Sequence, residues 1–411
     1  MARTGTDLSW LLLLPFAIVA VAGQAPPREE ARPASPPAVA AAFAAFDRFF
    51  DARLAEQGIV GASFVLLRDH RVAHARTFGV ADLRSRRPVD AETIFHWASI
   101  TKTFTAIGIM QLRDRGLLSL DDPIVAYVPE LRQVYNPYGP MDAITLRMLM
   151  SHSAGFRNPT WPWGGDQDWH PFEPPGWAQV AAMLPYTKIE FPPGSKYSYS
   201  NPGIIFLGRV IERLTGDDYE VYIDKNILKP LEMYRSFFDA APYHLRRHRS
   251  HSYFWRNGAP VEARFDFDTG VTVSNGGLNA PLADMAKYMD FLMGDPARQA
   301  DYDGVLRRAS LEEMWKPVVA VGRSEESPGG QMGLCFFLEQ HGGLPFVAHS
   351  GSQNGFISHF YVHMESRTAY LVAFNTVADP VGPDGKGNTR LVDRDIRDYV
   401  VKNVIPSLAA R

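Results

Sequence analysis

Short runs of strand character lie near both ends of the chain, and patterns of helical spacing precede, separate and follow them. Residues 39–54 repeat apolar side chains every three or four positions, which predicts a helix. Two runs of strand character follow at 62–67 and 72–78, with polar turn residues between them. The next apolar stretch, 99–112, returns to helical spacing.

The last third of the chain is again dominated by strand-like patterns. Aromatic and β-branched residues fill four runs that Gly, Pro and Asp separate, and residues 391–404 have the spacing of a closing amphipathic helix. The four runs are 331–339, 345–349, 355–365 and 369–376.

The middle of the chain differs from both ends. Residues 121–268 contain many prolines, most of the tryptophans and short helical patterns, one of them at 145–150. The clearest helix is 202–214, for which Asn201 is a suitable N-cap and Gly216 a suitable stop.

This order of elements predicts an α/β fold of the α+β type. We expect residues 39–120 and 269–405 to form one discontinuous domain, an antiparallel sheet flanked by the N- and C-terminal helices. Residues 121–268 would form a helix-rich inserted domain, and the active site would lie at the interface of the two domains.

The N-terminal residues have the features of a targeting segment. Residues 1–22 combine a basic start, an apolar run and small residues at Ala20 and Ala22, which predicts a secretory signal peptide. We therefore expect an exported protein, periplasmic or secreted, without a stable membrane span after cleavage; an uncleaved anchor is the alternative. Residues 23–38 are rich in proline and alanine and predict a disordered leader.

Charge and cysteine content narrow the function further. The 411 residues carry a formal net charge of −3, which gives no indication of a nucleic-acid surface. Cys335 is the single cysteine, so no internal disulfide can form. Its apolar neighbours favour a buried structural thiol over a nucleophile.

Ser99 and Lys102 are the first candidates for chemistry. On a helix, positions i and i+3 share a face, so the lysine amine can reach the serine hydroxyl. Apolar neighbours such as Phe95, Trp97 and Phe104 indicate burial, which lowers a lysine pKa and favours the neutral amine. Because serine is a weak nucleophile without an adjacent base, the pair predicts a serine nucleophile and a lysine base.

Tyr199 and Asn201 are a second candidate pair. Two residues apart in extended chain, their side chains would point the same way. Tyr199 can relay protons, and a nearby Lys102 favours its phenolate. Asn201 can hydrogen-bond a substrate amide while it also caps the following helix.

His349 and Gly351 follow a strand-like run and form the third candidate group. A glycine at a strand end lets a substrate approach the strand edge. His349 can polarise Tyr199 or bind a carboxylate; an ordinary histidine at a strand end is the alternative interpretation.

In this order the three groups resemble the motifs of the serine β-lactamase and penicillin-recognising family. That family includes class C β-lactamases, D-alanyl-D-alanine carboxypeptidases, D-aminopeptidases and family VIII carboxylesterases. The resemblance covers roughly residues 43–404. The motifs are Ser99-x-x-Lys102, Tyr199-x-Asn201 and His349-x-Gly351, and similar supporting stretches stand at 149–156, 191–195 and 276–278.

The resemblance implies a β-lactamase/transpeptidase-like fold and a role for each residue. Ser99 would be the acylated nucleophile, and Lys102 and Tyr199 would share the acid–base work, with the identity of the base left open. Asn201 would orient the substrate. The backbone N–H groups of Ser99 and Ser352 would form an oxyanion hole.

The function that follows is an exported serine hydrolase acting through an acyl-enzyme on a small-molecule ester or amide or a D-amino-acid peptide. His349 stands where class C β-lactamases usually carry lysine. This favours an esterase or D-amino-acid peptidase over the alternatives, a class C-like β-lactamase or a D-Ala-D-Ala carboxypeptidase. A non-catalytic protein that binds cell-wall peptide or penicillin is the alternative of another class. We expect no metal and no organic cofactor.

Two other stretches have competing interpretations. Residues 151–155 resemble the Gly-x-Ser-x-Gly elbow of α/β-hydrolases, but the first glycine and a preceding buried strand are missing, so Ser153 is the weaker nucleophile candidate. The aromatic stretch from Trp161 to Trp177 is either an acyl-group pocket or lid, or an insertion packed on the helical part.

Overall fold

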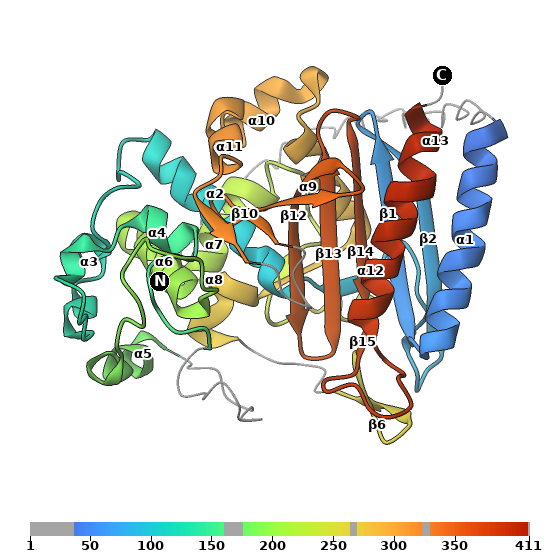
Figure 1. Ribbon diagram of the computed structural model, residues 1–411, viewed down its shortest axis with the longest axis horizontal. Coiled ribbons are helices and arrows are strands. Elements are labelled where there is room, and N and C mark those ends of the chain that lie inside the picture. The colour runs from blue at the N-terminus through green and yellow to red at the C-terminus, as the bar shows by residue number, and fades with distance from the viewer. Residues whose placement is uncertain (1–36, 160–175, 264–268, 323–328, 410–411) are drawn as a thin grey trace, which may run out of the picture. The chain divides into compact units, whose positions relative to one another are not determined.

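The computed structural model describes residues 37–159, 176–263, 269–322 and 329–409, and its central feature is an antiparallel sheet. Nine described strands pair in the order β3-β2-β1-β14-β13-β12-β11-β10-β9 (Figure 1). The N-terminal strand β1 (Gly61–Arg68) pairs with the C-terminal strand β14 (Thr368–Phe374). Both ends of the described chain therefore build one sheet, as the sequence predicts.

The remaining strands are short or complete the sheet on either side of this central pair. In chain order they are β2 (Arg71–Asp82), β3 (Arg87–Pro88), β4 (Ile94–His96), β5 (Phe237–Phe238), β6 (Tyr253–Arg256), β7 (Ala259–Glu262), β8 (Leu278–Pro281), β9 (Val319–Val321), β10 (Gly330–Met332), β11 (Phe337–His341), β12 (Leu344–Gln353), β13 (Phe356–His363) and β15 (Thr376–Val377).

Helices pack on both faces of the sheet. The part of the molecule farthest from α1 is also mainly helical (Figure 1). The helices are α1 (Pro37–Gln57), α2 (Thr101–Asp114), α3 (Ile124–Tyr127), α4 (Leu146–Met150), α5 (Trp177–Met183), α6 (Asn201–Thr215), α7 (Tyr219–Ile223), α8 (Val273–Gly276), α9 (Leu282–Met293), α10 (Gln299–Val305), α11 (Arg308–Met314), α12 (Thr389–Tyr399) and α13 (Ile405–Ala409).

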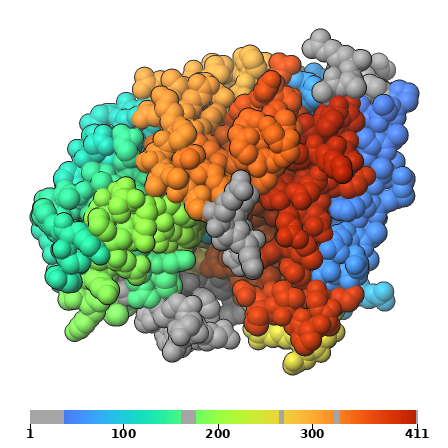
Figure 2. Space-filling model, viewed as in Figure 1, coloured from blue at the N-terminus to red at the C-terminus, as the bar shows by residue number. Residues whose placement is uncertain are grey.

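Alternation along β1 divides the hydrophobic core into two layers. Phe64 and Leu66 point to the face that α1, α12 and the following helical turns cover. Val65 and Leu67 point to the opposite face, where α9 packs and the core continues towards α2 and α6. Figure 2 shows α1 and the C-terminal helices beside one another on the outer face. Both faces of the central strands β1 and β14 are buried, which holds these strands in one register.

Several predicted boundaries change in the structure. The N-terminal helix begins at Pro37, so residues 37 and 38 belong to α1 and not to the predicted leader. The predicted signal peptide and residues 23–36 lie outside the described residues. The predicted strand 331–339 is wrong as a single strand, because β10 ends at Met332 and β11 begins at Phe337.

Close packing explains the break in that strand. A Cβ atom on Gly333 would lie 2.2 Å from the backbone oxygen of Met314. Cys335 then adopts a φ of +60° and donates its N–H to Met150 O at 2.7 Å. Its thiol is buried, as the sequence predicts, although not within a strand.

The predicted division into a sheet domain and an inserted helical domain stays a prediction. The larger buried core is continuous across its boundaries, joining residues such as Phe104, Leu149, Phe206 and Leu371. Within the part of the chain that is described, no helix combines the length and apolar character needed to cross a bilayer.

Candidate active site

Ser99 lies in a 3-10 turn, Ala98–Ile100, that leads directly into α2. The sequence predicts a helix from residue 99, but α2 itself begins at Thr101. The Thr101 hydroxyl donates to Ala98 O at 2.6 Å and closes this turn. Ala98 has a φ of +46°, a left-handed conformation that is uncommon for alanine. Such strained backbone is concentrated at functional sites.

Lys102 is completely buried one turn after Ser99. Its Nζ lies 2.9 Å from Ser99 Oγ and 2.7 Å from the backbone oxygen of Asn275 in α8. Burial lowers the pKa of Lys102 from 10.5 to about 7, although the neighbouring Cys335 thiol acts in the opposite direction. A neutral amine in this place donates to Asn275 O and has a lone pair for the Ser99 proton.

Tyr199 brings a phenol to the same two side chains. Lys102 Nζ lies 5.0 Å from the centre of the Tyr199 ring. Burial raises the pKa of Tyr199 well above its ordinary value, and a hydrogen bond with the Ser99 side chain lowers it only in part. The expectation of a phenolate is therefore wrong, because burial favours the neutral phenol of Tyr199 near neutral pH.

Asn201 begins α6 and is half-buried. The predicted N-cap was Asn201, but the structure assigns that place to Ser200, whose side chain accepts the Gly203 N–H. Ser200 is extended, with φ −137° and ψ +115°. Gly216 ends the helix in a left-handed conformation, as predicted. Because Ser200 supplies the cap, the Asn201 carboxamide is not needed for it.

His349, Gly351 and Ser352 lie inside β12, not at the end of a strand. β11 pairs with β12 only as far as Ala348, and beyond it β12 packs against the turn that carries Ser99. A Cβ atom on Gly351 would lie 2.1 Å from Trp97 O. The glycine thus admits the backbone that precedes the serine, and the predicted approach of a substrate at Gly351 stays a prediction.

His349 is 1% exposed and electrically neutral. Its Nδ1 lies 2.7 Å from Ser350 O, so Nδ1 carries the proton and Nε2 is the acceptor. Burial, with a smaller effect of Lys102, lowers the pKa of His349 to about 3. An imidazole in this state offers no positive charge to a carboxylate.

Sequence reasoning missed His152, which lies in the stretch treated as a mimic of the hydrolase elbow. Its imidazole stacks on Tyr199, with ring centres 4.3 Å apart. Its φ of +54° is the one local feature that could have drawn attention, but backbone angles are not readable from the sequence. Trp177, the one described aromatic residue of the stretch, packs on α6 through Phe206 and Arg209; residues 161–175 lie outside the described residues.

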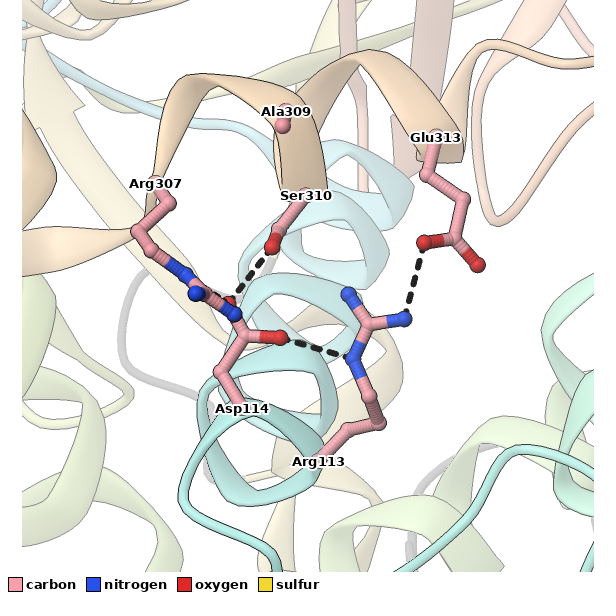
Figure 3. Close-up of a pocket in the computed structure, with 6 residues that line it drawn as sticks. All are labelled: Arg113, Asp114, Arg307, Ala309, Ser310 and Glu313. Atoms are coloured by element: carbon pink, nitrogen blue, oxygen red, sulfur yellow. Dashed lines mark hydrogen bonds and ion pairs between the residues drawn. The ribbon is translucent and has the colours of Figure 1, made fainter.

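Charged side chains at the far end of α2 form a separate, open pocket of about 440 Å³. Figure 3 shows Arg113 and Asp114 facing Arg307, Ser310 and Glu313. Asp114 accepts hydrogen bonds from Arg113 (2.7 Å) and Ser310 (2.5 Å). These groups are paired with one another, so the pocket fits an anchor between α2 and α11 better than a reaction site.

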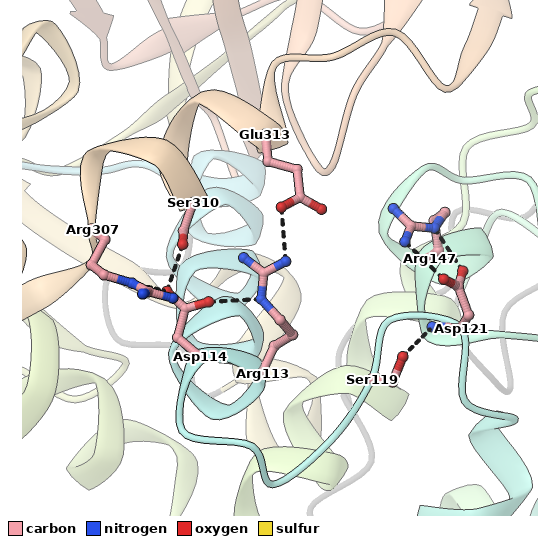
Figure 4. Close-up of polar contacts among 8 residues, drawn as sticks. All are labelled: Arg113, Asp114, Ser119, Asp121, Arg147, Arg307, Ser310 and Glu313. Carbon is pink, nitrogen blue, oxygen red and sulfur yellow. Dashed lines mark hydrogen bonds and ion pairs between the residues drawn. The ribbon is translucent and has the colours of Figure 1, made fainter.

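A second group of charged side chains lies near this anchor. It connects the loop before α3 with α4. Figure 4 shows Arg147 bidentate on Asp121, at 2.8 and 3.0 Å. Exposed pairs of this kind contribute about 0–1 kcal/mol to stability.

One group of described side chains has the composition of a metal site. Ligand atoms of His70, Asp290 and Asp295 lie within 4.8 Å of one another. His70 Nδ1 is 2.8 Å from Asp290, whose other oxygen accepts from Tyr302 at 2.5 Å. The group thus satisfies its own hydrogen bonds, and it is not part of the Ser99 site.

One protein family matches most of the described chain. A family model described as Beta-lactamase matches residues 46–394, so the chain belongs to the beta-lactamase family. The predicted β-lactamase/transpeptidase-like fold is thereby confirmed.

Relatives of known name include hydrolases. The chain is 30% identical to Esterase EstB of Burkholderia gladioli over 215 residues, 49% of this chain and 54% of the esterase. It is 25% identical to Protein flp of Staphylococcus aureus (strain COL) over 250 residues, 61% of this chain and 49% of that protein. The chain spans about half the length of these curated relatives.

Solved structures extend the likeness of the fold. D-amino acid amidase from Ochrobactrum anthropi SV3 has a TM-score of 0.71 at 21% identity, covering 89% of this chain and 99% of the amidase. The penicillin-binding protein homologue from Pyrococcus abyssi has a TM-score of 0.69 at 27% identity, and the match covers 81% of this chain and 73% of the homologue.

Proposed function

We propose that this protein is a serine hydrolase that cleaves esters or amides through an acyl-enzyme on Ser99. The observation that carries the proposal is the buried Lys102 amine, 2.9 Å from Ser99 Oγ. A buried lysine is unfavourable unless it is paired or used. No carboxylate pairs with Lys102 among the described residues, and its polar contacts are Ser99 and a backbone carbonyl.

The arrangement supports a two-step reaction. Neutral Lys102 takes the Ser99 hydroxyl proton as Oγ bonds to the substrate carbonyl carbon, whose π electrons move to oxygen. The backbone N–H groups of Ser99 and Ser352 would stabilise that oxyanion. When the carbonyl re-forms, the bond to the leaving group breaks and the leaving group takes the proton. Water then repeats the sequence on the acyl-enzyme and releases the acid.

Tyr199 fits the role of a neutral relay in this cycle. A phenol with a raised pKa keeps its own proton at rest and can pass one proton on as it receives another. Its hydrogen bond to Ser99 and its distance of 5.0 Å from ring centre to Lys102 Nζ support a path from the amine to the leaving group. Asn201, at the start of α6, would orient the substrate.

The charge of the site favours substrates without a carboxylate at this position. Neutral His349 stands where a cation would serve a β-lactam or a C-terminal peptide carboxylate. The similarity to an esterase points the same way. We therefore place carboxylic esters first, D-amino-acid amides or peptides second, and β-lactams or D-Ala-D-Ala peptides behind them.

We further propose that the protein is exported before it acts. Residues 1–22 support this through their basic start, apolar run and small residues at the predicted cleavage site. N-terminal sequencing of the protein recovered outside the cytoplasm would test it: a mature chain beginning near residue 23 supports export with cleavage, and an intact Met1 contradicts cleavage of a signal peptide.

The decisive experiment compares hydrolysis of p-nitrophenyl butyrate by the wild type, Ser99→Ala and Ser153→Ala. Ser99→Ala should abolish turnover while its far-UV circular dichroism stays unchanged. Ser153→Ala is the matched control, a buried serine outside the proposed machinery, and should keep its activity. Loss of activity in Ser153→Ala alone would mean that the assignment of Ser99 is wrong. No turnover by any of the three proteins would leave a narrow peptidase or the non-catalytic binder.

A further inference from the structure

His152 makes three contacts with Tyr199 and the two residues on either side of it. The two rings stack with centres 4.3 Å apart and planes at 27°. The Ser198 N–H donates to His152 O at 2.8 Å, and the Ser200 N–H donates to His152 Nδ1 at 3.2 Å. Residue 152 therefore holds the ring of Tyr199 and the backbone on both sides of it.

The hydrogen bond from Ser200 defines the protonation of the imidazole. Nδ1 accepts, so it carries no proton, and the proton of the neutral ring is on Nε2. Tyr199, Tyr197, Lys102 and His349 are the titratable groups around it. Burial lowers the pKa of His152 well below its ordinary value, and the charges of Lys102 and His349 act in the same direction. The ring is thus neutral wherever Lys102 can work.

Two features of His152 are costly for an ordinary packing residue. Its φ of +54° is a left-handed conformation that is uncommon for residues other than glycine, although histidine adopts it more often than most. Its Nε2 is buried and has no hydrogen-bond partner among the described residues. A buried unpaired donor and a strained backbone both reduce stability, and such features persist where function requires the side chain.

We propose that His152 is a positioning residue for Tyr199: its imidazole holds the phenol against Ser99 and Lys102 during proton transfer. The inference rests on the proposed hydrolase function and deepens it. Stacking limits tilting of the phenol ring, and the two hydrogen bonds limit movement of the chain that carries it. Small displacements matter because proton transfer requires hydrogen-bond distance.

The test separates the two contacts with two substitutions. His152→Asn keeps an acceptor near the position of Nδ1 and tolerates the positive φ, but it removes the stacked ring. His152→Phe keeps a ring and removes the acceptor for Ser200. Each is made in the wild type and in Tyr199→Phe, and kcat and KM for p-nitrophenyl butyrate are measured with the thermal midpoint of every variant.

We expect His152→Asn to lower kcat about 10- to 100-fold with KM changed less than about threefold. In the Tyr199→Phe background the same substitution should change kcat less than about threefold, because the positioned hydroxyl is already gone. Equal fold losses in both backgrounds, or no loss in the wild type, would overturn the proposal. If His152→Asn does not fold, the same cycle with His152→Phe decides.

Labelling with a fluorophosphonate probe keeps this test distinct from that of the hydrolase proposal. Mass spectrometry should find the probe on Ser99 in the wild type and, more slowly, in both His152 variants. A wild type that is not labelled at Ser99 contradicts the hydrolase itself. Labelling of Ser99 together with additive effects of His152 and Tyr199 contradicts only the positioning role.

Discussion

Lys102 donates to the backbone oxygen of Asn275 at 2.7 Å, and this carbonyl lies 173 residues further along the chain. A carbonyl holds the amine in place without giving it a counter-charge. An adjacent carboxylate would keep the lysine protonated and end its use as a base. The contact therefore combines two requirements of the proposed chemistry, a fixed position and a neutral amine.

The pH dependence of turnover should follow Lys102. Its pKa of about 7 means that the proton-accepting form is lost as pH falls below neutrality. We expect kcat/KM to fall about tenfold for each pH unit below about 7 and to level off above about 8. Hydrolysis rates between about pH 5 and 9, corrected for spontaneous hydrolysis, measure this; a flat acidic limb contradicts Lys102 as the base.

Lys102→Met should remove turnover and stabilise the fold. Folding lowers the pKa from 10.5 to about 7, so between these values the unfolded chain binds more protons and wild-type stability rises with pH. The cost of burying the amine is complete below pH 7 and vanishes above 10.5. We expect the free energy of unfolding of Lys102→Met to exceed that of the wild type by about 1–4 kcal/mol at neutral pH, and the difference to shrink towards about pH 9.5. Urea unfolding at each pH measures this. Lys402→Met, at an exposed position, is the control and should leave the free energy of unfolding at neutral pH unchanged.

Gly351→Ala should disturb Ser99 without touching a catalytic group. The added Cβ atom would lie 2.1 Å from Trp97 O, so β12 or the turn at Ala98–Ile100 must move. A shift of this size should lower kcat/KM about 100-fold. The control is Gly304→Ala in α10, where a Cβ atom meets nothing within 4 Å and activity should be unchanged. Full activity of Gly351→Ala would mean that the turn is not held by this contact.

Asp114→Asn should weaken the anchor of α2 while kcat stays as in the wild type. Burial raises the pKa of Asp114, but hydrogen bonds from Ser310, Arg307 and Arg113 outweigh it and leave the pKa below its ordinary value. The carboxylate thus stabilises the fold above about pH 4, and this contribution is lost as pH falls through the lowered pKa. We expect urea unfolding at pH 7 to show a free energy of unfolding about 1–2 kcal/mol lower than that of the wild type.

The control for that substitution is Asp142→Asn, which removes an exposed pair with Arg132. It should leave unfolding unchanged. If both substitutions have the same effect, or if Asp114→Asn slows turnover, the cluster in Figure 3 is more than a structural anchor.

Local contacts were the most predictable part of the site. The spacing of Ser99 and Lys102 places them on one face of any helical turn, so their meeting did not depend on the 3-10 geometry that the structure has there. The strands were predicted for a similar reason, because the apolar runs of β1 and β14 are properties of each strand alone. The break between Met332 and Phe337 was not predicted, because it depends on a backbone oxygen of Met314.

By itself, the sequence determined the pairing of Ser99 with Lys102, the ordered motifs that single out Tyr199, Asn201 and His349, and an antiparallel sheet built from both ends of the chain. The tertiary structure alone decided that Tyr199 is a neutral phenol, that Gly351 admits Trp97 O, and that His152 stacks beneath the proposed relay. The reason is physical: periodicity and spacing act within one element, whereas desolvation, close backbone approach and ring stacking arise when elements distant in sequence pack together.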